Sequence, residues 1–430
     1  MANKKKTTNK AKVNKVDKSG VTVSKKVGGK RVKAKFPWWL VALILVLVAA
    51  LAIGGVIYLR KTDADSKNKS SSSSSGLNTS SSSSNTSSST TGTGNFDSIS
   101  FHFLTLGNQY NGDSIYIKAG ENDILIDAGS RKGSESAIKS QIDQYCTDSK
   151  LEYVIATHSD QDHIAAFVGN SSNGEKQGIL YSYDIDTLID FDNVTKKKSD
   201  NPSQIYTDYL TARDNAISKG TKHYTGNQCF KGLDGASRVY TLGNGLTMEI
   251  LYQKYYEEVS SNENNHSVAL LFKQGEKKML FTGDLEDDGC DSLLESNDLG
   301  TVDLFKAGHH GSFNANGTSF IDAIQPNTIV CSCVAGSNEY TANNDNTMPY
   351  QNSINAWAKW TDDVYVTRYD SAPTGESGKI SKDAIKDLNG TVIVNYDQSG
   401  TKTISCSASN EKLKSSDWMK TYRQMPSNWA

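Results

Sequence analysis

The sequence predicts a layered α/β domain in the part of the chain that follows residue 95. Short apolar runs with the alternation of half-buried strands recur from residue 99 to residue 334, and four of them pair into two hairpins. Segments with helical spacing of apolar residues lie between these runs. Strand pairs that alternate with helices are typical of sheets covered by helices, and no repeat at solenoid spacing is present.

Each element follows from a local pattern. The expected strands are residues 99–106, 114–118, 123–127, 153–156, 267–272, 278–282, 302–307 and 328–334. The expected helices are residues 136–145 and 318–324. Residues 170–240 are polar and irregular, and we interpret them as insertions beside the site. In the last strand, Cys331 and Cys333 are expected to be small core residues that face opposite sides of the sheet.

Composition divides the rest of the chain. Residues 1–35 hold thirteen Lys or Arg and a single Asp, so this tail is predicted to be disordered. Residues 38–59 are uncharged and apolar. At about 1.5 Å per residue they are long enough to cross the ~30 Å hydrocarbon layer as one transmembrane helix. A flexible Ser/Thr-rich linker follows at 60–95, then the folded domain at 96–405 and a C-terminal extension at 406–430.

The flanks of the apolar segment predict its orientation. Trp38, Trp39 and Tyr58 are placed as interfacial aromatics, and the excess of Lys and Arg before the segment predicts a cytoplasmic N-terminus. The chain is thus expected in the cell membrane as a single-pass protein with an extracellular folded domain. The alternative is a cleavable signal peptide, although the apolar stretch is long for one. The lipid bilayer is the expected partner, and no obligate protein partner is inferred.

Six cysteines follow the apolar segment: Cys146, Cys229, Cys290, Cys331, Cys333 and Cys406. An even number in an oxidising compartment permits disulfides, but a domain of this size does not need them and their pairing is not deducible. No C-x-x-C pair is present, so a thiolate zinc site is not expected.

Two of the seven histidines lie in one six-residue run, His158-Ser159-Asp160-Gln161-Asp162-His163, directly after the strand at 153–156. A divalent metal needs neutral imidazole and ionised carboxylate ligands that converge from a loop. Alternation along this run can direct His158 and Asp160 to one ion and Asp162 and His163 to a second. The structural alternative is that Asp160 or Asp162 caps a helix that begins near His163.

Further candidates stand at the ends of other expected strands. Asp127 ends the strand at 123–127, Asp284 follows the strand at 278–282, and His309 and His310 follow the strand at 302–307. Each alone is compatible with a turn, since Asp before Gly is a frequent turn signal. Together they predict one site where strand ends converge.

This ordered set of residues resembles the metallo-β-lactamase superfamily. The His-x-Asp-x-Asp-His run and the Gly-His-His-Gly-Ser run at 308–312 are similar to the hydrolase domain of ComEC-type competence proteins. The supporting matches are Gly112-Asp113-Ser114, Asn264-Asn265-His266-Ser267 and Pro326-Asn327. The resemblance spans about residues 99–400 and implies an αββα sandwich with a metal-dependent hydrolase site at one edge, between the sheets. One membrane span cannot form a DNA-conducting pore, so transport by this chain alone is excluded.

The resemblance also implies roles for single residues. The implied metal ligands, for one or two ions of Zn or Mn, are His158, Asp160, Asp162, His163, Asp284 and His309. Asp284 would bridge the two ions, and Asp127 would orient a ligand histidine rather than bind metal. The implied catalytic groups are Asp162, His310 and Ser312, the last two through a proton or a hydrogen bond to an oxyanion. The sequence does not decide whether His309 or His310 is the ligand.

Two departures from the superfamily pattern matter. Asp160 stands where the superfamily usually has a second histidine, which makes the first metal position richer in oxygen and shifts it towards Mn. The superfamily's middle histidine ligand has no clear counterpart. Asn264, Asn265 and His266 stand near its place, and ligation by His266 remains open.

The implied reaction is attack by a metal-bound hydroxide on an ester, and a phosphodiester is favoured. Nucleic acid is the leading substrate by analogy with the ComEC-like branch. The acidic composition of the domain argues against broad DNA binding, and the run Lys196-Lys197-Lys198 is a local exception. One alternative is a cell-envelope phosphodiester, such as teichoic acid or a phosphocholine decoration; another is a catalytically inactive surface binding domain. β-Lactam hydrolysis is less favoured because the histidine ligands used for it are lost here.

Several tyrosines could line a pocket for an envelope ligand, or belong to a half-buried core instead. They are Tyr181, Tyr183, Tyr206, Tyr209, Tyr252, Tyr255 and Tyr256.

Overall fold

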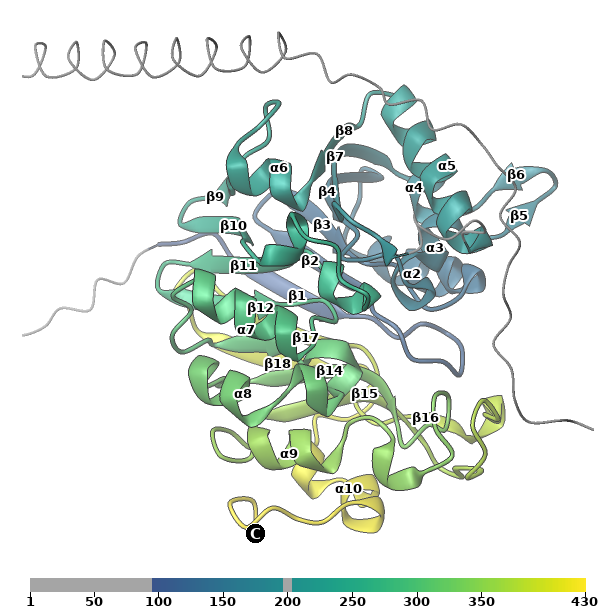
Figure 1. The fold of residues 1–430 in the computed structure, drawn as a ribbon, viewed down its shortest axis with the longest axis vertical. Helices are drawn as coiled ribbons and strands as arrows, with labels where there is room; N and C mark the ends of the chain where they lie inside the picture. The colour runs from purple at the N-terminus through teal and green to yellow at the C-terminus, as the bar shows by residue number, and fades with distance from the viewer. Residues whose placement is uncertain (1–94, 196–202) are drawn as a thin grey trace, which may run out of the picture. The chain divides into compact units, whose positions relative to one another are not determined.

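The computed structural model describes residues 95–195 and 203–430, and this part of the chain holds two eight-stranded sheets that face each other (Figure 1). The first sheet has the strand order β18-β17-β1-β2-β3-β4-β7-β8, and the second has the order β16-β15-β14-β13-β12-β11-β10-β9. Helices cover the outer side of both sheets, so the layers run helix, sheet, sheet, helix (Figure 1).

The strands are β1 (Ile99–Phe103), β2 (Ile115–Ala119), β3 (Asn122–Ile126), β4 (Lys150–Ile155), β5 (Ser171–Ser172), β6 (Glu175–Lys176), β7 (Asp184–Asp190), β8 (Lys222–Thr225), β9 (Val239–Gly243), β10 (Leu246–Leu251), β11 (Ala269–Gln274), β12 (Lys277–Phe281), β13 (Leu304–Lys306), β14 (Ile329–Ala335), β15 (Val364–Asp370), β16 (Ile385–Asp387), β17 (Val392–Tyr396) and β18 (Lys402–Cys406).

The helices are α2 (Glu135–Ile142), α3 (Gln161–Val168), α4 (Ile179–Ser182), α5 (Gln204–Ser218), α6 (Gly226–Lys231), α7 (Asp287–Ser296), α8 (Thr318–Ile324), α9 (Gln351–Trp357) and α10 (Asp417–Tyr422).

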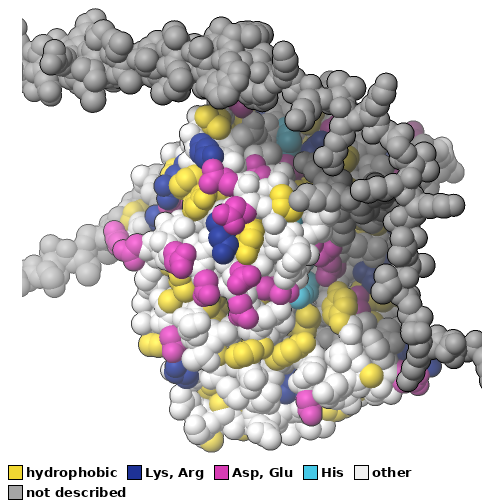
Figure 2. All heavy atoms as spheres, viewed as in Figure 1, with side chains coloured by type: hydrophobic (Ala, Val, Ile, Leu, Met, Phe, Trp, Pro, Cys, Tyr) yellow, Lys and Arg dark blue, Asp and Glu magenta, His cyan; other side chains and the backbone are white. Residues whose placement is uncertain are grey.

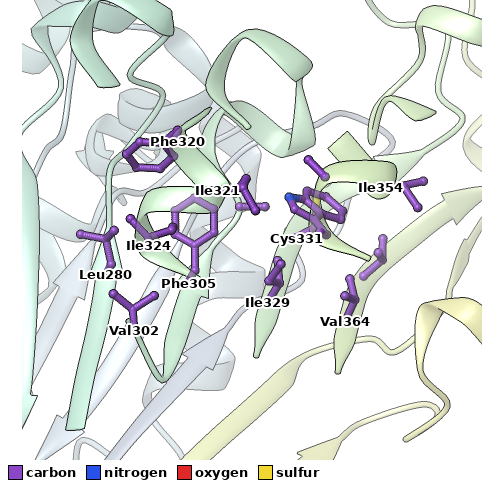
Figure 3. Packing of buried hydrophobic residues seen from close by; sticks show 14 of the residues in the cluster. Leu280, Val302, Phe305, Phe320, Ile321, Ile324, Ile329, Cys331, Ile354 and Val364 are labelled. Atoms are coloured by element: carbon purple, nitrogen blue, oxygen red, sulfur yellow. The ribbon is translucent and has the colours of Figure 1, made fainter. Parts of the chain in front are cut away.

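Three apolar clusters fill the spaces between the four layers. The middle cluster joins the inner faces of the two sheets, and Phe101 of the first sheet packs on Phe272 and Phe281 of the second. A second cluster lies between the first sheet and helices α2 to α5. The third lies between the second sheet and helices α7 to α10, where Phe305 of β13 contacts Phe320 of α8 (Figure 3). Strand β14 is buried at all seven positions because it is covered on both faces.

The strands and helices expected from the sequence are confirmed, with ends that differ by a few residues. The expectation for residues 170–240 is wrong about irregular structure, although Ser203, Gln204 and Ile205 of this region do lie beside the site. This region carries β7 and β8, which complete one edge of the first sheet, and helix α5, which packs on α3. The residues that this region contributes to the core lie between polar residues in the sequence. Its composition therefore did not indicate the strands and the helix.

The expectation for the paired cysteines is half correct. Cys331 and Cys333 are both buried in β14, but their Sγ atoms lie 3.5 Å apart and therefore share one side. This is the regular alternation of a strand, in which residues two positions apart point to the same face: Ile329, Cys331, Cys333 and Ala335 all lie in the cluster beneath the second sheet, and the expectation of opposite sides was wrong for that reason. All six cysteines are free thiols.

The segment after β18 packs on the domain. Trp418 and Trp429 are buried in the cluster beneath the second sheet, together with Leu413. Residues 406–430 thus contribute to the core of the sandwich.

No helix within residues 95–195 and 203–430 combines the length and the apolar character that a bilayer crossing requires. The tail at 1–35, the apolar segment at 38–59 and nearly all of the linker at 60–95 lie outside the described residues, as does the run Lys196-Lys197-Lys198.

Candidate metal centre

The candidate residues follow the C-terminal ends of parallel strands. β3 pairs parallel with β4 in the first sheet, and β12 pairs parallel with β13 in the second. Asp127 follows β3, His158 follows β4, Asp284 follows β12 and His310 follows β13. Because these strands end at the same edge, the turns that follow them meet there.

Close backbone packing fixes the motif run against the turn after β3. The backbone N–H of Asp113 donates to the carbonyl of Asp162 at 3.1 Å, and that of Ala128 donates to the carbonyl of His163 at 2.7 Å. A Cβ on Gly129 would lie 1.5 Å from the Asp162 carbonyl oxygen, so only glycine permits this approach. Asp160 is the residue before α3, but its side chain makes no capping hydrogen bond.

Asp127 orients His163 from behind, as the resemblance to the superfamily implied. Its Oδ2 lies 2.7 Å from Nδ1 of His163, and its two carboxylate oxygens accept from the N–H and hydroxyl of Thr157. This contact holds the proton on Nδ1 and leaves the Nε2 lone pair for a ligand. Nε2 faces Asp284, whose Oδ2 lies 3.0 Å away.

The two neighbouring histidines have different surroundings. His310 is fully buried, with Nδ1 3.0 Å from the carbonyl of Ser332 and Nε2 3.3 Å from Asp162 Oδ2 and 3.4 Å from Asp284 Oδ2. His309 is 20 % exposed and its Nδ1 lies 3.2 Å from Oε1 of Glu286. Both have left-handed backbone φ angles, 41° and 53°, which turn the two rings apart. The structure therefore brings His310, and not His309, to the motif carboxylates.

His158 supplies the clearest sign of a missing partner. Its ring is fully buried, and its Nδ1 lies 3.0 Å from the hydroxyl of Thr157. Its Nε2 is buried without a hydrogen-bond partner, and the nearest carboxylate oxygen, Oδ2 of Asp160, is 3.8 Å away. A buried nitrogen with an unused lone pair fits a metal ligand, because such atoms are otherwise paired.

Three groups of side chains at this site have candidate ligand atoms for a divalent ion within 4.8 Å of one another, and all three include His163. One group is Asp113, Asp127 and His163, and each of the other two includes a residue that borders a cavity. Of these two, the first is His158, His163 and Asp284, and the second is Asp162, His163 and His310. Asp160 and His309 fall outside all three groups and border the same cavity.

The field at the site favours a cation. Burial alone would lower the pKa of His163 and His310, but the carboxylate of Asp284, with Asp127 beside His163 and Asp113 beside His310, raises both well above the ordinary value. Burial would raise the pKa of Asp162, but its hydrogen bond with His310 and the nearby imidazoles hold it below the usual range. Buried carboxylates that stabilise protonated imidazoles in this way also attract a metal ion.

Two charged residues of the site were not among the sequence candidates for ligands. Lys306 is buried at the end of β13 and forms an ion pair with the buried carboxylate of Asp113. Asp113 Oδ1 also lies 3.5 Å from Nδ1 of His310. The signals available were a lysine that ends an apolar strand and the Gly112-Asp113-Ser114 match before the first hairpin.

His266 lies apart from all three ligand groups. It is buried, its Nε2 accepts a hydrogen bond from the N–H of Ser260 at 3.0 Å, and its Nδ1 lies 3.7 Å from Glu263. These contacts describe a histidine that closes a turn.

A cavity of about 810 Å³ opens over the site and is bordered by Asp162 and Asp284. The hydroxyl of Tyr340 donates to Asp162 Oδ2 at 3.1 Å, and Ser312, on the cavity wall, donates to Asn314. Arg131 stacks on Tyr110 and pairs with Glu339 at 3.0 Å, so its charge is already balanced.

The tyrosines singled out in the sequence belong mainly to the core. Tyr206, Tyr209 and Tyr256 are buried in apolar clusters. The cavity is bordered instead by Tyr340 and Tyr350.

Residues 107–189, which hold Asp113, Asp127 and the whole motif run, match the model of the metallo-beta-lactamase superfamily. The part of the chain that is similar to this superfamily thus includes the motif run and two of the buried carboxylates. The superfamily is one of metal-dependent hydrolases, and the donor set described above fits divalent metal binding.

Two curated relatives connect the chain with ComEC-type proteins. The chain is 27% identical over 191 residues to ComE operon protein 3 of Bacillus subtilis (strain 168), which covers 44% of the chain and 20% of that protein. It is 28% identical over 88 residues to Recombination protein 2 of Haemophilus influenzae (strain ATCC 51907 / DSM 11121 / KW20 / Rd), which covers 20% of the chain and 11% of that protein. The chain thus spans a fifth or less of the length of these relatives.

Solved structures match over larger shares of the chain but loosely. A mutant of CmlA beta-hydroxylase is 12% identical with a TM-score of 0.33, covering 62% of this chain and 52% of that one. A metallo-beta-lactamase of Cronobacter sakazakii with a HARLDQ motif is 14% identical with a TM-score of 0.28, covering 52% of this chain and 83% of that one. TM-scores this low carry no argument about the fold or the function of this chain.

Proposed function

We propose that the chain is a metal-dependent phosphodiesterase whose metallo-beta-lactamase-like domain works outside the cell. The observation that carries this proposal is the convergence of His158, His163 and His310 with Asp162 and Asp284 beside an open cavity. Three imidazoles and two carboxylates at one strand edge are the donor set of a divalent ion, and the orphaned Nε2 of His158 fits such an ion.

In this proposal Asp162, His163 and His310 hold one ion, and His158 with Asp284 provides a second position. Asp160, whose Oδ2 lies 3.8 Å from Nε2 of His158, adds oxygen character to that second position and shifts its preference from Zn towards Mn. His310 replaces His309 as the ligand, because only His310 faces Asp162. When bound, the metal would lower the pKa of a water molecule and polarise a phosphoryl oxygen.

The remaining groups position the reactants. Asp127 fixes the ring of His163, and the carbonyl of Ser332 fixes that of His310. The Tyr340 hydroxyl, whose single proton goes to Asp162 in this structure, can turn that proton to a substrate oxygen in the cavity when Asp162 holds a metal ion. Ser312 stands on the same wall and can do the same.

We place the domain on the outer surface of the cell membrane. The support is the uncharged apolar segment at 38–59 with basic residues before it, followed by a Ser/Thr-rich tether. The described domain has the role of the exposed catalytic part in this arrangement.

The relation to ComEC-type proteins makes a nucleic acid the first candidate substrate. A cell-envelope phosphodiester is the second, and among its forms the charge of the site favours a phosphocholine decoration over a long polyanion such as teichoic acid. The described cavity border carries the carboxylates of Asp160, Asp162, Asp284 and Glu339, whereas its Arg131 is already paired. The described part of the face in Figure 2 bears acidic side chains across its width and no continuous basic patch. A long polyanion, whether nucleic acid or teichoic acid, needs such a patch, whereas a phosphocholine decoration, whose phosphate charge is balanced by a quaternary ammonium group, does not.

The purified full-length chain decides between enzyme and binding domain. We expect bound Mn or Zn by elemental analysis and hydrolysis of bis-p-nitrophenyl phosphate when either metal is supplied. Asp162→Asn should abolish hydrolysis, whereas Asp417→Asn, a fully exposed carboxylate, should not change it. Cleavage that persists in Asp162→Asn would identify a contaminant. A wild-type chain with neither metal nor hydrolysis would make this an inactive binding domain.

The substrate is tested with the same pair of variants. Single-stranded DNA, duplex DNA and teichoic acid are compared at equal phosphodiester concentration and at two ionic strengths. If only DNA is cut, with loss of rate at higher salt, the envelope candidate is wrong; if only teichoic acid is cut, the nucleic-acid candidate is wrong.

A further inference from the structure

Lys306 is a lysine without access to solvent. Its side chain is 1% exposed, and it is the single buried lysine among residues 95–195 and 203–430. It ends β13, four residues before His310, and lies beneath the cavity rather than on its border. Burial of an ammonium group is costly unless other groups compensate for the lost hydration, so its surroundings require an explanation.

Three oxygen atoms surround the ammonium group. Nζ forms an ion pair with Asp113, lies 3.4 Å from Oδ1 of Asp284 and lies 3.3 Å from the carbonyl of Gly283. Two carboxylates and one carbonyl are also the donors that a hard divalent cation takes. The ammonium group thus stands where such an oxygen set could hold a metal ion.

The two oxygens of Asp284 face different cations. Oδ1 faces Lys306, whereas Oδ2 lies 3.0 Å from Nε2 of His163 and 3.4 Å from Nε2 of His310. The two oxygens of Asp113 also face different groups. Oδ2 forms the ion pair with Nζ of Lys306, and Oδ1 lies 3.5 Å from Nδ1 of His310. One buried positive charge therefore acts on two of the carboxylates that border the histidines, Asp113 and Asp284.

We propose that Lys306 is a built-in cation that sets the metal affinity of the centre. It fills the oxygen set of Asp113, Asp284 and Gly283, so that divalent ions bind on the histidine side of Asp284 alone. Its charge opposes that of a bound ion and keeps the affinity below the value that the carboxylates alone would give. Lys306 and Asp113 act through Asp284 and His310, and both are positioning residues. This inference rests on the metal centre proposed above.

A purely structural role for Lys306 makes the opposite prediction. If the side chain served only to hold Asp284 and His310 in place, its removal would loosen the ligands and weaken metal binding. If its charge sets the affinity, removal of the charge strengthens binding. The sign of the change therefore distinguishes the two roles.

The experiment is a double-mutant cycle of Lys306 and Asp113 in the full-length chain. Mn²⁺ is the probe, and its affinity is measured by competition with a fluorescent chelator. Lys306→Met removes the positive charge at nearly constant shape, and we expect Mn²⁺ to bind at least ~10-fold more tightly. Asp113→Asn removes a negative charge and should weaken binding by at least ~10-fold. The double variant should return to within about threefold of wild type. Lys306→Arg keeps the charge and should resemble wild type, as should Lys379→Met, which removes an exposed lysine.

Each outcome bears on a different claim. Weaker or equal binding in a folded Lys306→Met variant would overturn the inference and leave the metal centre intact. If Lys306→Met does not fold, the double variant decides, because it must bind Mn²⁺ at least tenfold more tightly than Asp113→Asn. Absence of Mn²⁺ and Zn²⁺ binding in wild type would instead overturn the proposed function.

Discussion

Buried histidines occur in two contrasting regions of this molecule. In the metal centre, His163 and His310 are fully buried among the carboxylates of Asp113, Asp127 and Asp284. On the outer face of the first sheet, His102 is equally inaccessible, but it is packed between the rings of Tyr116 and Tyr145. The carboxylates raise the pKa of the first two, whereas burial lowers the pKa of His102 to about 4. For these three histidines the charge of the neighbouring groups, and not burial alone, sets the direction of the pKa shift.

The largest expected effect is the difference in Mn²⁺ affinity between variants of His310 and of His309. His310→Gln removes a ligand that faces Asp162 and Asp284, and we expect a loss of Mn²⁺ affinity on the order of 100-fold or more, with loss of hydrolysis. His309→Gln removes a partly exposed ring paired with Glu286, and the affinity should stay within about threefold of wild type. Metal titration of both variants measures the difference.

The same two variants, His310→Gln and His309→Gln, can contradict this prediction. Equal losses in the two variants, or a larger loss in His309→Gln, would mean that burial among carboxylates does not identify the ligand. The proposed exchange of His309 for His310 would then be withdrawn.

A smaller loss of Mn²⁺ affinity is expected at Asp127, which contacts the ligand His163 but is not itself a proposed ligand. Asp127 contacts Nδ1 of His163 at 2.7 Å and binds Thr157, but it does not border the cavity. Asp127→Asn keeps the shape and removes the charge that holds the imidazole, so Mn²⁺ affinity should fall by about 10-fold to 100-fold. The number of ions bound at saturation should not change. A lower number of ions at saturation, measured by elemental analysis, would make Asp127 a ligand itself.

The sequence predicts one half of this site better than the other. The run from His158 to His163 and the acids Asp127 and Asp284 could be recognised because each follows an apolar strand in a fixed order. The choice between His309 and His310 could not, because it depends on two consecutive left-handed residues that turn the rings apart. Lys306 has the pattern of any lysine at a strand end, and only the three-dimensional position of Asp113 gives it a role.

The fold shows the same limit. Strands with continuous apolar runs, such as β14, were predictable from periodicity, as was helix α8. The strands β7 and β8 were not, since β7 places three aspartates among its apolar residues and β8 buries none of its four residues. The shared side of Cys331 and Cys333, by contrast, was predictable, because residues two positions apart in a regular strand point to the same face of the sheet.

The smallest effect is expected at His102, the buried histidine packed between the rings of Tyr116 and Tyr145, and it is an effect on how stability depends on pH. Its pKa of about 4 in the folded chain lies below the value of ~6.5 in an unfolded chain, because burial disfavours the charged ring. Above pH 6.5 both states are neutral, and His102 has no influence on stability. As the pH falls from 6.5 towards 4, the unfolded chain binds a proton that the folded chain does not, so unfolding is favoured by about 2 kcal/mol at pH 5.

His102→Phe keeps the ring contacts with Tyr116 and Tyr145 and removes the titration. Urea unfolding of the full-length chain at pH 7 and pH 5, followed by near-UV circular dichroism, gives the free energy of unfolding for wild type and variant. We expect the loss between the two pH values to be about 2 kcal/mol smaller in His102→Phe. An equal loss in both would mean that His102 takes up a proton in the folded chain as readily as in the unfolded one. Aromatic neighbours would then not keep a buried histidine neutral, and the contrast with His163 and His310 would lose its physical basis.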